Sequence, residues 1–244
     1  LKLIILKILL NLFHFINSRG ILDYSHDKNS ELKIQVGALS SINEIIPFSY
    51  KRLKICDVKK IHKAEDTLGE LLTGEKIYNT LYIANTAQNT LCNTLCLNKF
   101  NGKTVSRIQK LIKGNYFSNW YLDKLPAGLL QYDIDKKKSK IDYFTGIPIG
   151  YEKNDLFYIY NHLQFHILLN KIGEDKYNIV GFNILPISIR HNESQAICSK
   201  KFGNDLLNNF YKTPQVLTDS INILFTYDVV YEYSNVTLAL RWDH

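Results

Sequence analysis

The stretch Ile221–Tyr231, which reads INILFTYDVVY, decides the fold class of this chain. Apolar and aromatic residues recur in it at every second position: Ile221, Ile223, Phe225, Tyr227, Val229 and Tyr231. Successive side chains of a β-strand point to opposite faces, so this spacing places all six on one face of a half-buried strand. We therefore predict a strand here, with Phe225 in the core and Asp228 and Glu232 on its polar face.

The same alternation recurs elsewhere in the chain. Segments rich in Ile, Phe and Tyr predict two more long strands, over Leu156–Leu169 and Tyr177–Ile189. Pro186 cannot donate a hydrogen bond to a neighbouring strand, so it places the second segment at a sheet edge or a bend. Three shorter segments are further candidate strands: Leu32–Val36, Ile77–Ile83 and Leu129–Ile134.

Helix signals occur in two places. Thr67–Glu70 has the spacing of a capping box and Gly74 can close the turn, which predicts a helix of two turns at most. Ser106–Gln109 repeats the box and predicts a helix over about Val105–Trp120. Many strands, two helices and no regular strand–helix alternation predict a mainly β fold, an antiparallel β-sandwich-like domain with two short helical insertions.

The first residues have the pattern of a secretory signal peptide. Leu1–Ile16 is an apolar run with Lys2 and Lys7 near its start, and the small residues Ser18 and Gly20 follow it. The run is shorter than a membrane-spanning helix requires. We predict a signal peptide over residues 1–20; an amphipathic helix packed on the fold or an uncleaved anchor remain alternatives.

Composition is that of a folded domain. The chain has 244 residues, of which 45% are hydrophobic and 22% charged, which excludes a disordered chain and a coiled coil. We find no repeat or linker, so residues 21–244 are predicted to form one domain. The chain starts at Leu1 and contains no methionine, so we expect the sequence to be a fragment at its start.

The net charge of +7 does not indicate a nucleic-acid partner. Part of it lies in the leader, and part lies in one polar stretch that we interpret as a solvated loop. That stretch contains Lys136, Lys137, Lys138 and Lys140. No RNA-binding aromatic signature, helix-turn-helix signal or zinc-finger spacing is present in the sequence, so we expect no nucleic-acid binding.

The four cysteines, Cys56, Cys92, Cys96 and Cys198, predict two disulfides in a chain that enters the secretory route. Three connectivities are open, and we expect either that Cys92 pairs with Cys96 or that one of the two bridges to Cys56. The spacing C-x3-C differs from that of zinc ribbons and thioredoxin-like motifs, so neither a metal nor a redox role is expected.

Two sequons, Asn192-Glu-Ser194 and Asn235-Val-Thr237, make Asn192 and Asn235 candidate glycosylation sites.

Few residues indicate catalysis or metal binding. His162 and His166 have zincin spacing, but on a strand this spacing separates the imidazoles by about 13 Å, so we interpret them as a polar sheet face. Glu65, Asp66 and Glu70 lie close together near a capping box, where they stabilise a helix start. Tyr158 and Tyr160 are interpreted as half-buried sheet residues. No phosphate loop, dinucleotide fingerprint or nucleophile elbow occurs in the sequence, so we predict neither an enzyme nor a cofactor.

Several segments, taken in order, carry a likeness to a known family. The early ones are Ile46–Tyr50 with Leu53–Cys56 ("LPYEYYSLPFC" in the family), Lys63–Ile77 ("KAENLGEVLRGDRI"), Cys92–Cys96 ("CEVLC"), and Asn115–Phe117 with Asp123–Pro126 ("DYY" and "DNLP"). The later ones are Gly150-Tyr151, Tyr160–Leu163 ("LHNHL"), Phe182–Ile189 ("FEVIPQSI"), Phe225–Val229 ("FTYSV") and Arg241–Asp243 ("RWD"). Residues 30–244 thus resemble the luminal N-terminal region of the nonaspanins, the transmembrane nine superfamily. The family's "YLPG" element is not recognisable around Ile21–Tyr24.

The resemblance implies a Golgi or endosomal multi-pass membrane protein whose predicted spans follow the "RWD" segment. It implies a role in sorting other membrane proteins, notably those with glycine-rich transmembrane segments, and in their surface delivery. Because cargo recognition is attributed chiefly to the membrane part, the resemblance implies that this chain is the luminal domain. It offers no enzymatic residues to carry over.

A soluble secreted module that binds glycan or lipid is the alternative hypothesis. Exposed aromatic residues, such as Trp120, Tyr121 or Trp242, would stack on the ligand. We favour the simpler interpretation that they pack in the core or between sheets. An enzyme is a third and weaker hypothesis.

Overall fold

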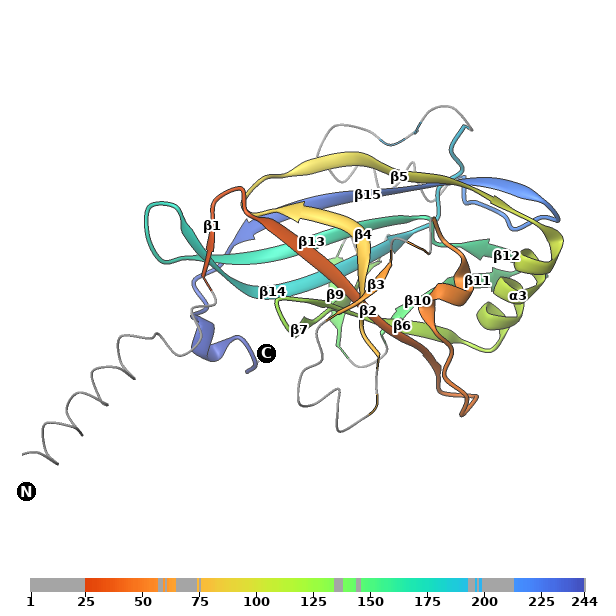
Figure 1. Ribbon diagram of the computed structural model, residues 1–244, viewed down its shortest axis with the longest axis horizontal. Helices are drawn as coiled ribbons and strands as arrows, with labels where there is room; N and C mark the ends of the chain where they lie inside the picture. Colours follow the sequence, from red (N-terminus) through yellow and green to blue (C-terminus); the bar gives the residue numbers. More distant parts are fainter. Residues whose placement is uncertain are drawn as a thin grey trace, which may run out of the picture.

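The computed structural model (Figure 1) describes residues 25–56, 59, 61–64, 74, 76–133, 138–143, 146–192, 196, 198 and 213–243. The predicted signal peptide over residues 1–20 and the predicted helix at residues 67–70 lie outside these residues. Within them, no helix is both long enough and apolar enough to cross a bilayer.

Two sheets, packed face to face, make up most of the described part of the chain (Figure 1). Seven described strands form the larger sheet in the order β5-β15-β13-β14-β8-β9, with β1 paired to β14. Their bounds are β1 Ser25–Asp27, β5 Thr90–Phe100, β8 Gly128–Asp133, β9 Lys138–Asp142, β13 His162–Lys171, β14 Lys176–Ile187 and β15 Ile221–Tyr233.

Six described strands form the smaller sheet in the order β10-β6-β2-β4-β3, with β7 paired to β6. Their bounds are β2 Glu31–Ser41, β3 His62–Lys63, β4 Tyr78–Asn85, β6 Tyr116–Leu122, β7 Leu125–Pro126 and β10 Ile147–Pro148. The strands β11 Gly150–Lys153 and β12 Leu156–Ile159 form a separate hairpin, and the short 3-10 helices are η1 Tyr50–Leu53 and η3 Leu238–Leu240.

Aromatic side chains join the two sheets. The ring of Tyr82 on β4 lies 5.3 Å from that of Phe165 on β13 and 5.2 Å from that of Tyr227 on β15, both in edge-to-face contact. The ring of Trp120 on β6 lies 6.2 Å from that of Phe165. Such contacts contribute about 0.5–1.5 kcal/mol each beyond the area that they bury. The core therefore lies between the sheets, and Phe225, which is 1% exposed, belongs to it as predicted.

The mainly β, sandwich-like fold class is confirmed. Two pairings in the larger sheet, however, are parallel: β13 with β15 and β14 with β8. The larger sheet is therefore mixed, whereas the sequence predicted antiparallel pairing throughout. Strand character depends on local periodicity, but strand direction depends on residues far apart in the chain.

Most of the predicted strands are present. β15 covers Ile221–Tyr233, and the three short candidates correspond to β2, β4 and β8. The predicted strand over residues 156–169 is divided into β12 and β13, because the chain leaves the hairpin at residues 160–161 to enter the larger sheet. Pro186 lies near the end of β14, beyond the two residues that pair with β8, so β8 requires no hydrogen bond from it.

The second predicted helix has different bounds in the structure. The helix α3 runs over Gly102–Lys113, and its N-cap is Asn101, whose side chain accepts a hydrogen bond from Thr104 N at 3.0 Å. It ends before Asn115, which has a left-handed φ of 51°. The following residues form β6, where buried and half-buried residues alternate as far as Leu122. The prediction of helix up to Trp120 was wrong because alternating residues after Asn115 were assigned to a helical face.

The two described ends of the chain meet at one carboxylate. Arg241 Nη1 lies 3.0 Å from Asp123 Oδ2 and donates a second hydrogen bond to the carbonyl of Ile179, at 3.3 Å. His26 Nε2 lies 3.5 Å from the other oxygen of Asp123. Asp123 lies in the turn between β6 and β7, and Ile179 lies on β14, so Arg241 contacts both sheets.

We expect Phe225→Asp to lower the free energy of unfolding by roughly 3–5 kcal/mol, because it places an unpaired charge between the sheets. Tyr233→Asp is the matched control, since Tyr233 lies on the same strand but is 69% exposed. Urea unfolding followed by circular dichroism would measure both. A near-unchanged midpoint for Phe225→Asp would show that this face of β15 does not form the core.

Candidate functional site

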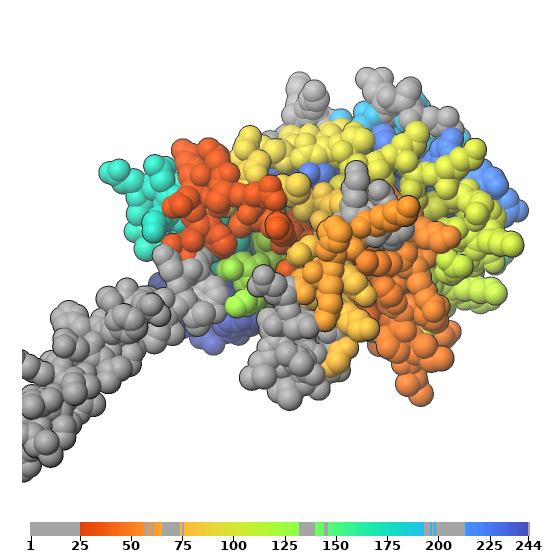
Figure 2. Space-filling view, viewed as in Figure 1, coloured from red at the N-terminus to blue at the C-terminus, as the bar shows by residue number. Residues whose placement is uncertain are grey.

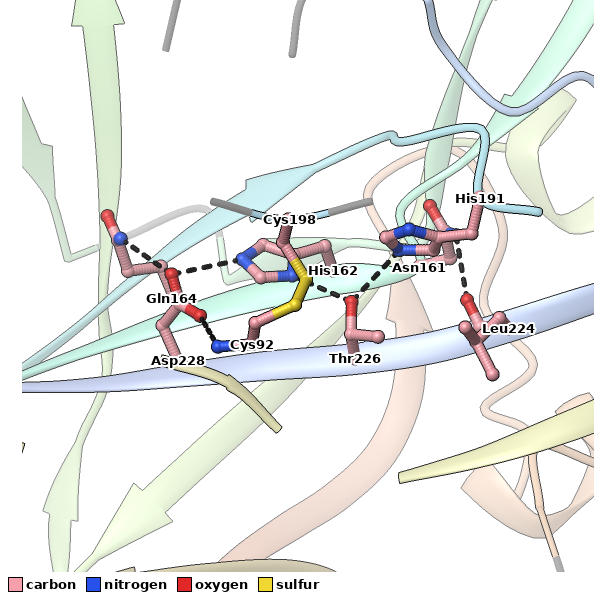
Figure 3. The surroundings of a disulfide bond; sticks show 9 residues. All are labelled: Cys92, Asn161, His162, Gln164, His191, Cys198, Leu224, Thr226 and Asp228. Carbon is pink, nitrogen blue, oxygen red and sulfur yellow. Dashed lines mark hydrogen bonds and ion pairs between the residues drawn. A yellow bond between two sulfur atoms is a disulfide. The ribbon is translucent and has the colours of Figure 1, made fainter. Parts of the chain in front are cut away.

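Polar residues, most of them buried, gather around the disulfide between Cys92 and Cys198 (Figure 3). We call them the histidine cluster, and its members are Asn161, His162, Gln164, His191, Thr226 and Asp228. Asn161, His162 and Thr226 are at most 1% exposed, and Asp228 is 6% exposed. Polar groups are rarely buried to this degree unless they are hydrogen-bonded to one another.

The parallel register of β13 and β15 brings the cluster together. His162 lies opposite Thr226, and Gln164 lies opposite Asp228. Since alternate residues of a strand share a face, all four side chains point to the same side of the sheet. Phe225, on the other side of β15, is buried in the core, so both faces of this strand are covered.

Asp228 is the acceptor at one end of the cluster. Its Oδ1 accepts a hydrogen bond from Cys92 N at 2.6 Å, and its Oδ2 accepts one from Gln164 Nε2 at 3.1 Å. His162 Nε2 lies 3.3 Å from Oδ2. Burial alone would raise the pKa of the Asp228 carboxyl, but the hydrogen bond and charge of His162, together with these donors, hold that pKa below its ordinary value. The carboxylate is therefore charged and paired.

The hydroxyl of Thr226 lies between two histidines. Thr226 Oγ1 is 2.8 Å from His162 Nδ1 and 3.0 Å from His191 Nε2. Its single proton can be donated to only one of the two rings. The hydroxyl can accept a hydrogen bond from His162 and donate its proton to His191 when the His191 ring is neutral. Burial, and then the charge of His162, lower the pKa of His191 to about 4, in agreement with this arrangement.

His166 extends the polar face along β13. Its Nε2 lies 2.9 Å from Gln164 Oε1, and its Nδ1 lies 3.8 Å from Glu232 Oε1. Burial lowers the pKa of His166, while the carboxylates of Glu232 and Asp228 act in the opposite direction. Gln164 separates His166 from His162, and within the described part of the chain no three His, Cys, Asp or Glu residues are grouped closely enough to hold a metal ion.

The segment that follows β14 covers the cluster and is fastened to it. Asn161 Nδ2 donates to the carbonyls of Ile189 and Leu224, at 2.8 and 2.9 Å, and Asn161 Oδ1 accepts from Ile189 N at 2.9 Å. His191, two residues later, contacts Thr226. A disulfide then joins Cys198 to Cys92 on β5.

All four cysteines are paired. The structure links Cys56 to Cys96 and Cys92 to Cys198, with Cα–Cα distances of 5.7 and 5.4 Å. Of the pairings left open by the sequence, a bridge from the C-x3-C motif to Cys56 is therefore present, and a Cys92–Cys96 bridge is absent. Cys92 lies where the pairing of β5 with β15 is irregular, and its φ is 57°. In this conformation its N–H points to Asp228 Oδ1.

The histidine cluster was only partly predictable. His162 and Asp228 were interpreted as polar residues of a sheet face, and they do share a face, but both are buried and paired with each other. Glu232 is exposed, as that interpretation requires. No local pattern indicated His191 or Asn161 as partners, because Asn161, which precedes β13, bonds to Ile189 and Leu224, and His191, which follows β14, bonds to Thr226 on β15. The one available signal was that polar residues recur at every second position in two otherwise apolar strands, at His162 and Gln164 in β13 and at Thr226 and Asp228 in β15.

The remaining sequence candidates are dispersed. Trp120 is buried in the core, Tyr121 is half-buried, and Trp242 is 58% exposed with the guanidinium of Arg241 over its ring at 5.6 Å. Asn192 and Asn235 are both exposed. The acidic residues 65, 66 and 70 and Lys136 and Lys137 lie outside the described residues.

An apolar groove lies beside β8 and β14, and residues of both strands line it. It has a volume of about 360 Å³. Tyr151 and Tyr160 line it, and their rings lie 5.6 Å apart; Tyr158, which stacks on Tyr151 at 4.9 Å, is half-buried as predicted. Among the described residues that line the groove, apolar and aromatic side chains predominate, which suits contact with an apolar ligand surface.

Comparison with known proteins gives consistent matches. The family model described as Endomembrane protein 70 matches residues 47–244. Transmembrane 9 superfamily member 8 of Arabidopsis thaliana is 32% identical over 238 residues, which cover 92% of this chain and 37% of that protein. Transmembrane 9 superfamily member 4 of Homo sapiens is 29% identical over 243 residues, which cover 92% and 38%. The chain therefore spans less than two fifths of the length of these two relatives.

We expect the free energy of unfolding to fall as the pH is lowered from about 6.5 towards 4. A histidine whose pKa is lowered on folding takes up its proton more readily in the unfolded chain, so acid favours unfolding between the two pKa values. His191 and His166 both act in this direction. Asp228, whose pKa is also lowered, adds its own loss only at still lower pH, as its carboxylate is protonated.

Urea midpoints measured from pH 7.5 to 4.5 would test this expectation. His191→Gln should flatten the pH dependence, and His62→Gln is the matched control because His62 is exposed on β3. Equal slopes for the parent and His191→Gln would exclude His191 as a contributor.

Peptide mapping without reduction should recover Cys92 linked to Cys198 and Cys56 linked to Cys96. Replacing Cys92 and Cys198 together by Ser should cost about 2–5 kcal/mol of stability, because the bridge closes a long loop in the unfolded chain. Recovery of a Cys92–Cys96 peptide, or of free thiols in secreted protein, would contradict the assignment.

Proposed function

The chain belongs to the Endomembrane protein 70 family, whose curated relatives are transmembrane 9 superfamily proteins, and from this premise we propose that it is the luminal domain of a sorting protein. Family membership supports a membrane protein of the endomembrane system. The proposal goes further: the whole protein, in Golgi or endosome membranes, binds other membrane proteins as cargo and directs them to the cell surface. Cargo is recognised mainly by membrane-spanning segments beyond this chain.

The observation that carries the proposal is the family match over residues 47–244, which includes most of both sheets. Two disulfides support a position on the luminal side, because disulfides persist in oxidising compartments. The exposed Asn235, in a sequon whose three residues are all described, is available to a luminal glycosyltransferase.

We propose a non-enzymatic role for this domain. Its most unusual polar residues, in the histidine cluster, are covered on both sides: Thr226 is fully buried and is already bonded to two histidines. Nucleophilic catalysis requires a hydroxyl that a substrate can reach. The cluster is instead suited to holding the segment that covers it. Because histidines take part, the stability of this contact depends on luminal pH.

The alternative, a soluble secreted module for glycan or lipid, has one observation in its favour. Tyr151 and Tyr160 line the groove beside β14 and could contact a sugar face. Trp120, however, packs between the sheets and therefore cannot stack on a ligand, which weakens this alternative. We therefore retain the sorting proposal as the first.

The luminal position can be tested by glycosylation. Protein made in secretory cells should lose mass on treatment with an N-glycosidase, and Asn192→Gln with Asn235→Gln should abolish the loss. Each single variant shows which site is used, and Thr237→Ala is a matched control that removes the second sequon without changing its asparagine. Folded protein that carries no glycan in any form would contradict the luminal position.

The sorting role can be tested in the source organism. Removal of the gene should lower the surface amount of membrane proteins with glycine-rich transmembrane segments, while their total amount changes less, and restoring the intact gene should reverse the effect. Membrane proteins without such segments are the internal control. Unchanged surface amounts of both classes would overturn the sorting role and leave the luminal fold unaffected.

A further inference from the structure

Three exposed isoleucines stand on one short loop. Ile42, Ile45 and Ile46, in the connection from β2 to η1, are 83%, 99% and 65% exposed. We call residues 42–47 the isoleucine loop. A single exposed apolar side chain is common on a protein surface, but three within five residues form an apolar tip that water solvates poorly.

The loop is held in a defined shape. Its base is closed by two hydrogen bonds between Leu39 and Phe48, of 2.7 and 2.9 Å. The hydroxyl of Tyr116 lies 2.9 Å from the carbonyl of Ile46 and 3.0 Å from a carboxylate oxygen of Glu44. Hydrogen bonds therefore hold the backbone of the loop in the conformation that exposes the isoleucine side chains.

Basic residues flank the base of the loop. The guanidinium of Arg52 lies 4.9 Å from the centre of the Phe48 ring. Ser41 Oγ, at the start of the loop, donates to the carbonyl of Gly114, and the exposed Lys113 precedes this glycine in the chain. Glu44 is the one acidic residue of the loop, and the hydroxyl of Tyr116 bonds to its carboxylate. An apolar tip with a basic collar is suited to a lipid surface.

The loop and the C-terminal residues lie on the same side of the molecule. In Figure 1 the connection between β2 and η1 projects from the right part of the lower edge, and the dark blue C-terminal turn lies toward the left part of that edge; Figure 2 shows the projection as an orange lobe. Near the C-terminus, Leu240 is 52% exposed and Trp242 is 58% exposed. Tryptophan is enriched where proteins meet the membrane–water interface.

We propose that the isoleucine loop inserts into the surface of the bilayer, so that this side of the domain faces the membrane. The inference rests on the proposed function, in which membrane-spanning segments follow residue 244 and bring the C-terminal side to the bilayer. The domain would then contact lipid at two places, the isoleucine loop and Trp242. A bilayer is a better occupant than a protein partner, because the apolar surface is a narrow projecting tip and not a flat patch.

Depth measurements on the 244-residue chain can test the contact directly. In Ile45→Trp the new indole should show a blue-shifted emission with phosphatidylcholine vesicles and be quenched by brominated phosphatidylcholine. Ile172→Trp is the matched control: Ile172 is 56% exposed, but it lies in the turn between β13 and β14, away from the lower edge in Figure 1. Trp120 and Trp242 are present in both variants, so the difference reports on position 45.

Vesicle flotation gives an independent measure. Replacing Ile42, Ile45 and Ile46 by Ser should lower the partition coefficient on phosphatidylcholine vesicles about tenfold or more, since three apolar side chains leave the bilayer. Ile172→Ser should leave it unchanged. Added phosphatidylserine should strengthen binding of the parent and the triple Ser variant alike, through the basic collar.

Two results would overturn the inference. One is equal quenching at positions 45 and 172; the other is equal partitioning of the triple variant and the parent, which would assign lipid binding to another part of the chain. An apolar tip that contacts a protein would give both results. A glycosylated, membrane-associated protein with an unquenched indole at position 45 would refute the loop contact alone, whereas absence of glycan would refute the proposed function.

Discussion

The parallel pairing of β13 with β15 is the constraint on which the rest of the structure depends. It sets His162 against Thr226 and Gln164 against Asp228, and it buries Phe165 and Phe225 on the opposite face. A shift by one residue would place phenylalanines under the cover and a carboxylate between the sheets. Because both faces are buried, the register is fixed from two sides, by packing on one and by hydrogen bonds on the other.

A parallel pair needs a long connection, and the described residues just after β14, which begin that connection, cover the histidine cluster. Ile189 exchanges hydrogen bonds with Asn161, and His191 contacts Thr226. Cys198, farther along the same connection, is joined by a disulfide to Cys92, the residue whose N–H also bonds to Asp228. The covalent link and the hydrogen bond to the buried carboxylate are therefore both made by Cys92.

Local sequence accounted for much of the fold. Alternation in β15 predicted both the strand and the burial of Phe225, and similar patterns located β2, β4 and β8. It failed at α3, where Asn101 caps the helix earlier than Ser106, and at β6, whose residues were assigned to a helix. It also missed the pairing of His162 with Asp228. Strand direction and side-chain pairing across the sheet depend on contacts between residues more than sixty positions apart, and no local pattern contains them.

The contact between Arg241 and Asp123 has a mechanical consequence. A pull on the C-terminal residues is transmitted through Arg241 to the β6–β7 turn of one sheet and, through the carbonyl of Ile179, to β14 of the other. The force is therefore shared by the two sheets before it reaches β15, so β15 is not pulled away from its sheet alone. A force on the last described residues therefore acts on both sheets at once and not on the end of β15 alone.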